Sequence, residues 1–180
     1  MENNMEHLMY PVGRYQKPEA FTEELKNEWL NVLANMPSWL DASIENLDEA
    51  QLQVPYREGG WNIPQVVHHI ADSHLNAFVR VKLALTEDNP TVKPYDEKAW
   101  AELPDTKVVP VNVSVTLIHA LHRRLVALLE NISTEQWQRT YYHPEHQRNF
   151  PIWEVVALYA WHSRHHAAHI MNLRETQGWN

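Results

Sequence analysis

The chain has 180 residues, of which 44% are hydrophobic and only four are glycine, and this composition predicts one helix-rich domain spanning residues 1–180. A formal net charge of −8, with scattered lysines and arginines, argues against a nucleic-acid partner held through its phosphates. The absence of cysteine excludes disulfides, thiolate ligands and a cysteine nucleophile. Because no stretch approaches about 18 apolar residues and the first nine lack an apolar signal core, we expect a cytoplasmic protein with no membrane partner.

The N-terminal quarter predicts an extended arm followed by a helix. Two prolines and a glycine within residues 1–21 favour an extended arm on the surface. Thr22 is a good N-cap for a first helix, in which apolar residues recur at helical spacing. Pro37 interrupts this pattern, so we expect two helical pieces with a break or kink at Met36–Pro37.

A second long helix is predicted after a connector with paired glycines. Asn62 is a candidate N-cap, and Gln65, three residues later, completes a capping box. The helix should span residues 63–85 and end before Pro90. The next segment, residues 88–113, is too long for a simple turn and contains one candidate short helix at 96–100.

Two further long helices complete the predicted fold. One opens at Ser114 and carries leucines as far as Leu129, and a short capped helix follows at Ser133. Residues 139–150 form a connection that can contain a small hairpin. The last helix runs from Pro151 in its first turn to Gln177, with Gly178 as its stop. Together these elements predict an all-α four-helix bundle with long crossover connections.

Four histidines lie within eight residues of the last predicted helix: His162, His165, His166 and His169. At about 100° of rotation per residue, they fall on a stripe roughly 100° wide that also carries apolar residues. A bundle should bury this face, and burying one unpartnered polar ring costs on the order of 1–3 kcal/mol. A bound metal ion would offset that cost, and a solvated histidine face without metal is the alternative interpretation.

The spacing of these histidines suits metal coordination. His162 with His166, and equally His165 with His169, form an i,i+4 pair that brings two imidazole nitrogens over one point. A third ligand must come from another helix, and His69 lies at the edge of the apolar arc of the second helix. Three neutral nitrogen ligands with an open position are typical of catalytic zinc-type sites, although nickel, iron or manganese could occupy the same ligands.

The other polar residues near this pattern carry no assigned role. His74 also points inward but lies nearer the far end of the second helix, and spacing assigns nothing to His68 or Asp72. Four histidines without a comparable arrangement are expected on the surface: His119, His122, His143 and His146.

Distinctive blocks of sequence are spread over nearly the whole chain. They include Tyr10-Pro11 with Gly13, Pro55-Tyr56-Arg57 before Gly59-Gly60-Trp61, Gln65 to His69, Ala71 to His74, Lys93 to Trp100, Tyr142-His143-Pro144 and Trp161-His162-Ser163. Together they resemble the YfiT branch of the DinB-like superfamily, whose members are described as metal-dependent hydrolases.

The resemblance implies a four-helix bundle, one divalent metal ion per chain (zinc or nickel) and a homodimer. It also implies the ligands: a histidine before an aliphatic residue on the second helix, here His69, and an H-x-x-x-H pair on the last helix, here His162 and His166. Arg164 lies between the paired ligands, and we expect its cationic head to project sideways.

The reaction stays open at this stage. A metal-dependent hydrolase would use water as nucleophile, and Asp72 or Glu97 are possible acid–base groups that nothing in the sequence fixes. Other members of the superfamily transfer low-molecular-weight thiols such as bacillithiol, so a thiol S-transferase acting on a small molecule is the alternative. A bundle that only binds metal, without catalysis, is the third hypothesis.

Overall fold

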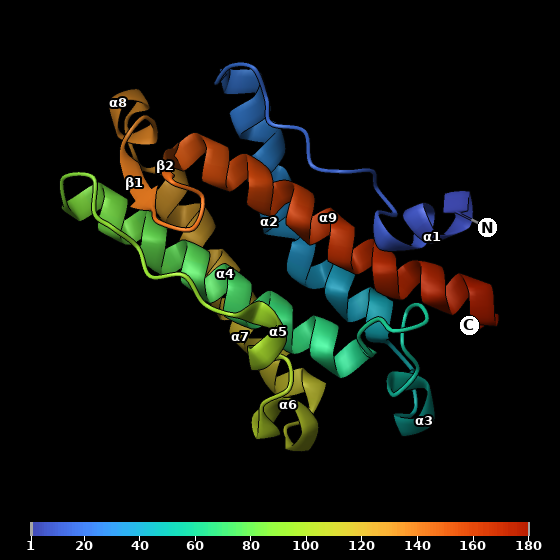
Figure 1. Cartoon of the computed structure of the whole chain (residues 1–180). Coiled ribbons are helices and arrows are strands. Elements are labelled where there is room, and N and C mark those ends of the chain that lie inside the picture. The colour runs from blue at the N-terminus through green and yellow to red at the C-terminus, as the bar shows by residue number, and fades with distance from the viewer. Residues whose placement is uncertain (1, 180) are drawn as a thin grey trace.

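A computed structural model describes residues 2–179, with side chains from residue 5 on, and four long helices dominate it (Figure 1). They are α2 (Glu23–Ile44), α4 (Ile63–Thr86), α7 (Val111–Glu130) and α9 (Ile152–Gln177). Helix α2 packs against α7 and α9, and α4 packs against the same two helices. The predicted four-helix bundle is therefore confirmed.

Neighbouring helices run parallel in two of these four contacts. Helices α2 and α9 point the same way, as do α4 and α7, while the α4–α9 and α2–α7 pairs are antiparallel (Figure 1). Two parallel neighbours cannot be joined by a tight turn. The chain after α4 therefore runs back along that helix, through α5 (Glu97–Trp100) and α6 (Pro104–Val108), before α7 begins. The predicted short helix at 96–100 is confirmed, and α6 is an addition to it.

Small elements close the two ends of the bundle. Helix α3 (Glu49–Leu52) lies between α2 and α4, and α8 (Thr134–Trp137) follows α7 with the predicted capping box at Ser133. The predicted hairpin is confirmed as the antiparallel strands β1 (Thr140–His143) and β2 (Arg148–Pro151).

The prediction of an extended arm over residues 1–21 is wrong for its first part. Residues Glu2–Met9 form helix α1, because the glycine and the prolines that favour extended chain begin only at Pro11. From Tyr10 onward the segment lies along α9, where the indole Nε1–H of Trp161 donates to the carbonyl oxygen of Gly13 at 3.0 Å.

Of the break or kink predicted at Met36–Pro37, the break is wrong, since α2 is continuous through Pro37. Proline has no N–H, so the carbonyl of Leu33, four residues earlier, lacks its usual helical donor. The imidazole Nδ1–H of His122, on α7, donates to this carbonyl at 2.6 Å instead. A side chain from the neighbouring helix thus supplies the hydrogen bond that the proline removes.

The ends of the other long helices lie close to their predicted positions. Helix α4 begins at the predicted capping box, in which Asn62 and Gln65 bond reciprocally at 3.0 and 3.1 Å. Helix α7 begins three residues before the predicted Ser114. Helix α9 ends at Gly178, whose φ of 68° is the left-handed conformation that glycine adopts most readily.

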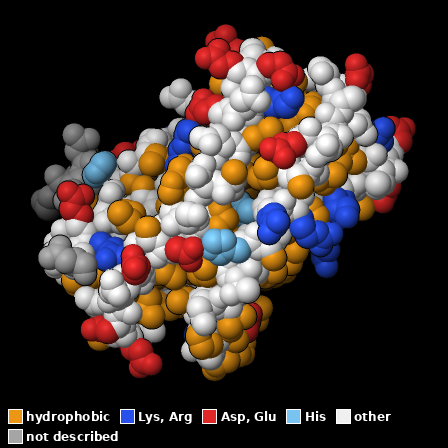
Figure 2. Space-filling view, turned by 180° about the vertical axis from the view of Figure 1, so that it is seen from behind, with side chains coloured by type: hydrophobic (Ala, Val, Ile, Leu, Met, Phe, Trp, Pro, Cys, Tyr) orange, Lys and Arg blue, Asp and Glu red, His pale blue; other side chains and the backbone are white. Residues whose placement is uncertain are grey.

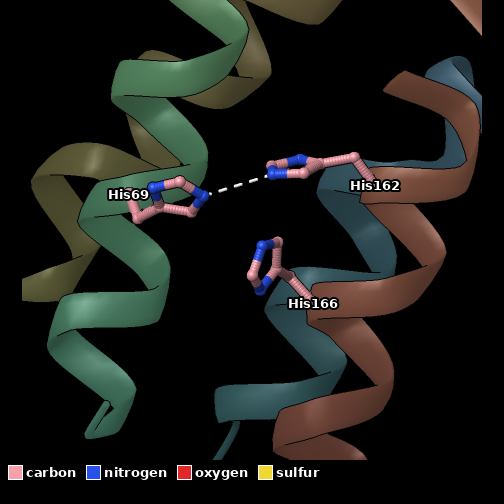
Figure 3. A group of neighbouring side chains, drawn as sticks. All are labelled: His69, His162 and His166. Atoms are coloured by element: carbon pink, nitrogen blue, oxygen red, sulfur yellow. Dashed lines mark hydrogen bonds between the residues drawn. The ribbon is translucent and has the colours of Figure 1, made fainter. Parts of the chain in front are cut away.

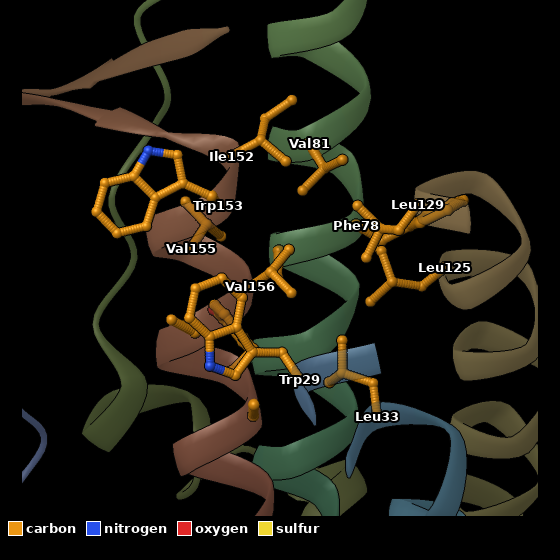
Figure 4. Packing of buried hydrophobic residues seen from close by; sticks show 14 of the residues in the cluster. Trp29, Leu33, Phe78, Val81, Leu125, Leu129, Ile152, Trp153, Val155 and Val156 are labelled. Carbon is orange, nitrogen blue, oxygen red and sulfur yellow. The ribbon is translucent and has the colours of Figure 1, made fainter. Parts of the chain in front are cut away.

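The buried apolar residues form two clusters along the bundle. Figure 4 shows the larger one, in which Trp29 and Leu33 of α2 pack with Val156 of α9 and with residues of α4 and α7. The second cluster is built around Met36, Ile70 and other residues at the opposite end. Along α9 the first cluster ends at Ala160 and the second begins at Ile170, so the histidine-rich turns lie between two apolar layers.

Some large apolar side chains stay on the surface. Figure 2 shows hydrophobic side chains on the protruding end of the molecule where α6 lies, and Leu103, Val108 and Val113 are 47%, 75% and 53% exposed there. Among the described residues, no helix combines the length and the apolar character needed to cross a bilayer.

Candidate metal centre

Three histidines from two antiparallel helices converge in the middle of the bundle (Figure 3). His69 projects from α4, and His162 and His166 project from successive turns of α9. One nitrogen of each ring lies within 4.8 Å of the others. The Nε2 atoms of His69 and His162 are 3.2 Å apart. Spacing along the sequence left His165 with His169 as an equal pair, and the packing of α9 on α4 turns His162 and His166 toward His69.

This donor set fits a divalent metal ion. Two nitrogens that each lie about 2.1 Å from one ion at a tetrahedral angle are about 3.4 Å apart. The observed 3.2 Å between His69 and His162 is close to that separation. The geometry is therefore compatible with a zinc-type centre that draws three ligands from the protein.

Burial keeps the three imidazoles neutral. His69 and His166 are buried and His162 is half-buried. Burial, with a smaller contribution from the neighbouring His165, lowers the pKa of His69 to about 4. Burial, followed by the surrounding imidazoles, also holds the pKa values of His162 and His166 well below the usual range. Neutral rings at pH 7 offer lone pairs, which is the form that metal ions bind.

The three histidines form part of the wall of a cavity of about 710 Å³. Aromatic side chains supply much of the remaining wall: Tyr10, Tyr56, Trp61 and Trp161. Charged groups also reach the cavity: Arg57, Glu97, Lys98 and Glu102. His162 and Glu97 line a second, smaller cavity of about 220 Å³ as well. The histidine group is thus open to a small molecule on one side.

The loop between α3 and α4 places a positively charged side chain, that of Arg57, at this cavity. Arg57 has a buried Nε atom with no hydrogen-bond partner among the described residues, while its Nη1 donates to the carbonyl of Glu58. A Cβ atom at Gly60 would lie 2.8 Å from Cγ of Arg57, so this position needs glycine. Tyr56 stacks on the ring of His169 with centroids 4.0 Å apart.

The other two histidines of α9 face the N-terminal segment. His169 places Nε2 3.2 Å from the carbonyl of Met9 and Nδ1 3.4 Å from Nδ1 of His166. His165 stacks on Trp161, and its buried Nδ1 has no partner among the described residues. His165, His166 and His169 form a second group of nitrogens within 4.8 Å of one another.

Three polar residues named from the sequence lie outside the cavity. His68 bonds Ser114 of α7 at 2.7 Å and the carbonyl of Val109 at 3.1 Å, so it ties α4 to the start of α7. Asp72 is half-buried, which raises the pKa of its carboxyl group, and it does not line the cavity. As expected, Arg164 points away and pairs with Glu28 at 2.8 Å.

The comparisons with known proteins agree with this architecture. A model of the DinB superfamily matches residues 33–170. The protein YfiT of Bacillus subtilis is 44% identical over 174 residues, which cover 97% of this chain and 98% of YfiT. The chain belongs to the DinB superfamily, in its YfiT branch.

Two further comparisons support this assignment. A Bacillus cereus relative that carries the provisional name of metal-dependent hydrolase is 46% identical, over 97% of this chain and 100% of its own. The solved structure of YfiT superimposes with a TM-score of 0.94 over 97% of this chain and 99% of that one. That structure is described as a probable metal-dependent hydrolase with an unusual four-helix bundle topology.

Two histidines of this DinB-superfamily chain contradict the expectation of a surface position. His122 and His143 are buried, while His119 and His146 are exposed as predicted. His122 is buried because Pro37 leaves the carbonyl of Leu33 in need of a donor. A proline inside the first helix was the only sequence signal for this contact. Nothing in the local pattern around His122 reveals which carbonyl its ring will meet.

Proposed function

We propose that the protein is a metal-dependent hydrolase in which His69, His162 and His166 hold one divalent ion, zinc or nickel, per chain. The convergence of three neutral imidazoles at the wall of the 710 Å³ cavity carries this proposal. Three protein ligands leave a coordination position for water or substrate, which separates catalytic from structural zinc sites. The hydrolase names of the relatives support the same class of reaction.

The residues of the chain supply the rest of the chemistry. When bound, the ion would lower the pKa of a coordinated water toward about 7 and polarise the bond to be cleaved. Glu97 lines the same cavity as His69 and His162, and its carboxylate can accept the proton of the attacking water. Of the two acid–base candidates from the sequence, this position favours Glu97 over Asp72.

Substitution of the proposed base tests this function. Glu97→Gln is expected to lower kcat for ester or amide hydrolysis by about 100-fold or more, because the amide cannot accept the proton. The metal content should stay unchanged. Glu102→Gln is the matched control, since Glu102 lines the same cavity and bonds Gln65 and Lys107. Equal losses in the two variants, or chelator-insensitive turnover, would contradict the proposal.

A second candidate function is thiol S-transfer at the same ion. One observation favours it: the guanidinium of Arg57 and the ammonium of Lys98 belong to residues that line the cavity, and they can bind carboxylates of a small thiol cosubstrate. Without cysteine in the chain, any sulfur nucleophile must come from such a molecule.

An electrophile separates the two reactions. Metal-loaded protein is incubated with monochlorobimane, with and without small thiols such as bacillithiol. Transfer predicts conjugate formation above the uncatalysed rate, lost in His69→Ala. Hydrolysis predicts no such enhancement, inhibition by the thiols at the open position, and turnover of esters or amides. Chelation abolishes both activities and therefore does not distinguish them.

We also propose a homodimer, on the resemblance to the YfiT branch and on the exposed apolar side chains near α6. Light scattering at micromolar concentration should give twice the monomer mass of 21.2 kDa. A mass near 21.2 kDa would rule out a stable dimer at that concentration.

A further inference from the structure

A row of hydrogen-bonded imidazoles leads from the backbone of α2 to the candidate metal centre. Nδ1 of His122 lies 2.6 Å from the carbonyl oxygen of Leu33. Nε2 of His122 lies 2.9 Å from Nδ1 of His74, and Nε2 of His74 lies 3.0 Å from Nδ1 of His162. His74 and His122 are fully buried. Neither is among the residues proposed to touch the ion.

The carbonyl at one end fixes the position of every proton in this row. A carbonyl oxygen can only accept, so Nδ1 of His122 must carry hydrogen. In a neutral imidazole the other nitrogen is then bare, so Nε2 of His122 accepts from Nδ1–H of His74. The same step repeats, and Nε2 of His74 accepts from Nδ1–H of His162. The last ring is left with a bare Nε2, the atom that faces His69.

We propose that His74 and His122 are positioning residues that hold His162 in the tautomer whose Nε2 lone pair is directed at the ion. The inference rests on the ligand set proposed above and adds the groups that orient one of its members. Outer-shell partners of this kind fix the ring and increase the basicity of the ligand.

The origin of the row lies in Pro37. In an unbroken helix the carbonyl of Leu33 would accept the N–H of residue 37, and proline removes that donor. The freed carbonyl is the acceptor that His122 uses. A proline in α2 is thereby connected, through α7 and α4, to a side chain of α9. All four long helices of the bundle contribute to the orientation of His162.

His166 has a shorter row of the same kind. Nε2–H of His169 donates to the carbonyl of Met9 at 3.2 Å, which leaves Nδ1 of His169 bare. That atom lies 3.4 Å from Nδ1 of His166, so it can accept the Nδ1–H of that ring. His166 then also offers its Nε2 lone pair. Both histidines of the H-x-x-x-H pair are held in the same tautomer, each by a backbone carbonyl.

This assignment also accounts for the second group of histidine nitrogens without a second ion. In that group, Nδ1 of His166 and both nitrogens of His169 already have hydrogen-bond partners. An ion bound there would have to replace these bonds. The group is therefore assigned to support of the first centre, and the expected stoichiometry is one ion per chain.

The tautomer of His162 determines which ring nitrogen of His69 carries hydrogen. Since Nε2 of His162 is bare, a hydrogen bond between it and Nε2 of His69, 3.2 Å away, needs Nε2–H of His69 as donor whenever no ion lies between the two rings. Metal binding at Nε2 of a neutral His69 would require its hydrogen to move to Nδ1. His69 is thus the one ligand whose tautomer changes on metal uptake, whereas His162 and His166 keep theirs.

Nitrogen-15 NMR of the histidine rings tests the proposal in the metal-free protein, where no activity is involved. The shifts of the two ring nitrogens distinguish the tautomers. We expect Nδ1–H for His122, His74, His162 and His166, and Nε2–H for His69 and His169. On titration with zinc only His69 should change tautomer. An Nε2–H form of His162 or His166, or two ions bound per chain, would overturn it.

A variant links the tautomer to affinity. His122→Phe removes the source of the row and should weaken zinc binding about 10- to 100-fold. His119→Phe, three residues earlier on α7 and paired with Asp41 on the surface, should leave affinity within 3-fold. Unchanged zinc affinity in a folded His122→Phe variant would refute the proposal. If that variant does not fold, the NMR spectra of the wild type decide the question. Metal retained after His162→Ala would refute the ligand set instead, so the two failures are distinguishable.

Discussion

Replacing His162 or His166 with alanine is expected to lower metal affinity by more than about 100-fold. The binding free energy of a structural zinc site amounts to roughly 3 kcal/mol for each of its ligands. The two imidazoles that remain in either variant would compete poorly with water for the ion. His165→Ala is the matched control, because His165 lies on the same helix and contacts Trp161. Its affinity should change by less than a few-fold. Metal content after dialysis, measured by elemental analysis, gives the comparison.

Two outcomes would contradict the ligand assignment. If purified His162→Ala keeps one tightly bound ion per chain, His162 is not a ligand. If His165→Ala loses as much metal as His166→Ala, the ion lies in the second group, with His169. Thermal unfolding provides an independent readout, since a ligand that binds only the folded state raises the melting temperature with its concentration. The wild type and His165→Ala should respond to zinc, and His162→Ala should not.

Much of the fold could be predicted because its signals are local. The capping boxes at Asn62 and Ser133 and the stop at Gly178 act within one turn of the chain, and each is present in the structure. The failures have distant causes. Nothing near Pro37 says that a histidine 85 residues later will bond the carbonyl that the proline frees. Local signals therefore predicted a break where the bundle maintains a helix.

The candidate site, too, could be predicted only as far as its signals are local. Helical periodicity placed four histidines of α9 on one stripe, but it could not choose between the two i,i+4 pairs. The choice depends on how α9 is rotated against α4, and that rotation directs His162 and His166 toward His69. His165 and His169 face the N-terminal segment, whose α1 the sequence did not predict. The resemblance to the family implied the same three histidines, whereas their neighbours His74 and His122 are brought to the site only by the packing of α4 and α7.

The last expected result concerns the stability of the protein at acidic pH. Lowering the pH of the metal-free protein from about 7 toward 4 should strongly reduce its free energy of unfolding. The pKa of His69 is lowered to about 4, that of His165 to about 4 and that of His169 to about 3, each mainly by burial. Near pH 5 the unfolded chain therefore binds protons that the folded protein excludes. The free energy of unfolding must then rise with pH in this range. As the pH falls, it decreases between the pKa of histidine in the unfolded chain, about 6.5, and the lower pKa values of the folded protein.

The size of this loss follows from the shifts. For His69, which is buried, a fall from 6.5 to about 4 corresponds to on the order of 3 kcal/mol. Denaturant unfolding of metal-free protein at pH 7, 6, 5 and 4.5 measures the loss. His69→Gln should flatten the profile, while His119→Gln, on the surface, should leave its shape unchanged. A free energy that stays constant between pH 7 and 5 would mean that the buried imidazoles accept protons without unfolding. The neutral rings on which metal binding depends would then not be a property of the fold.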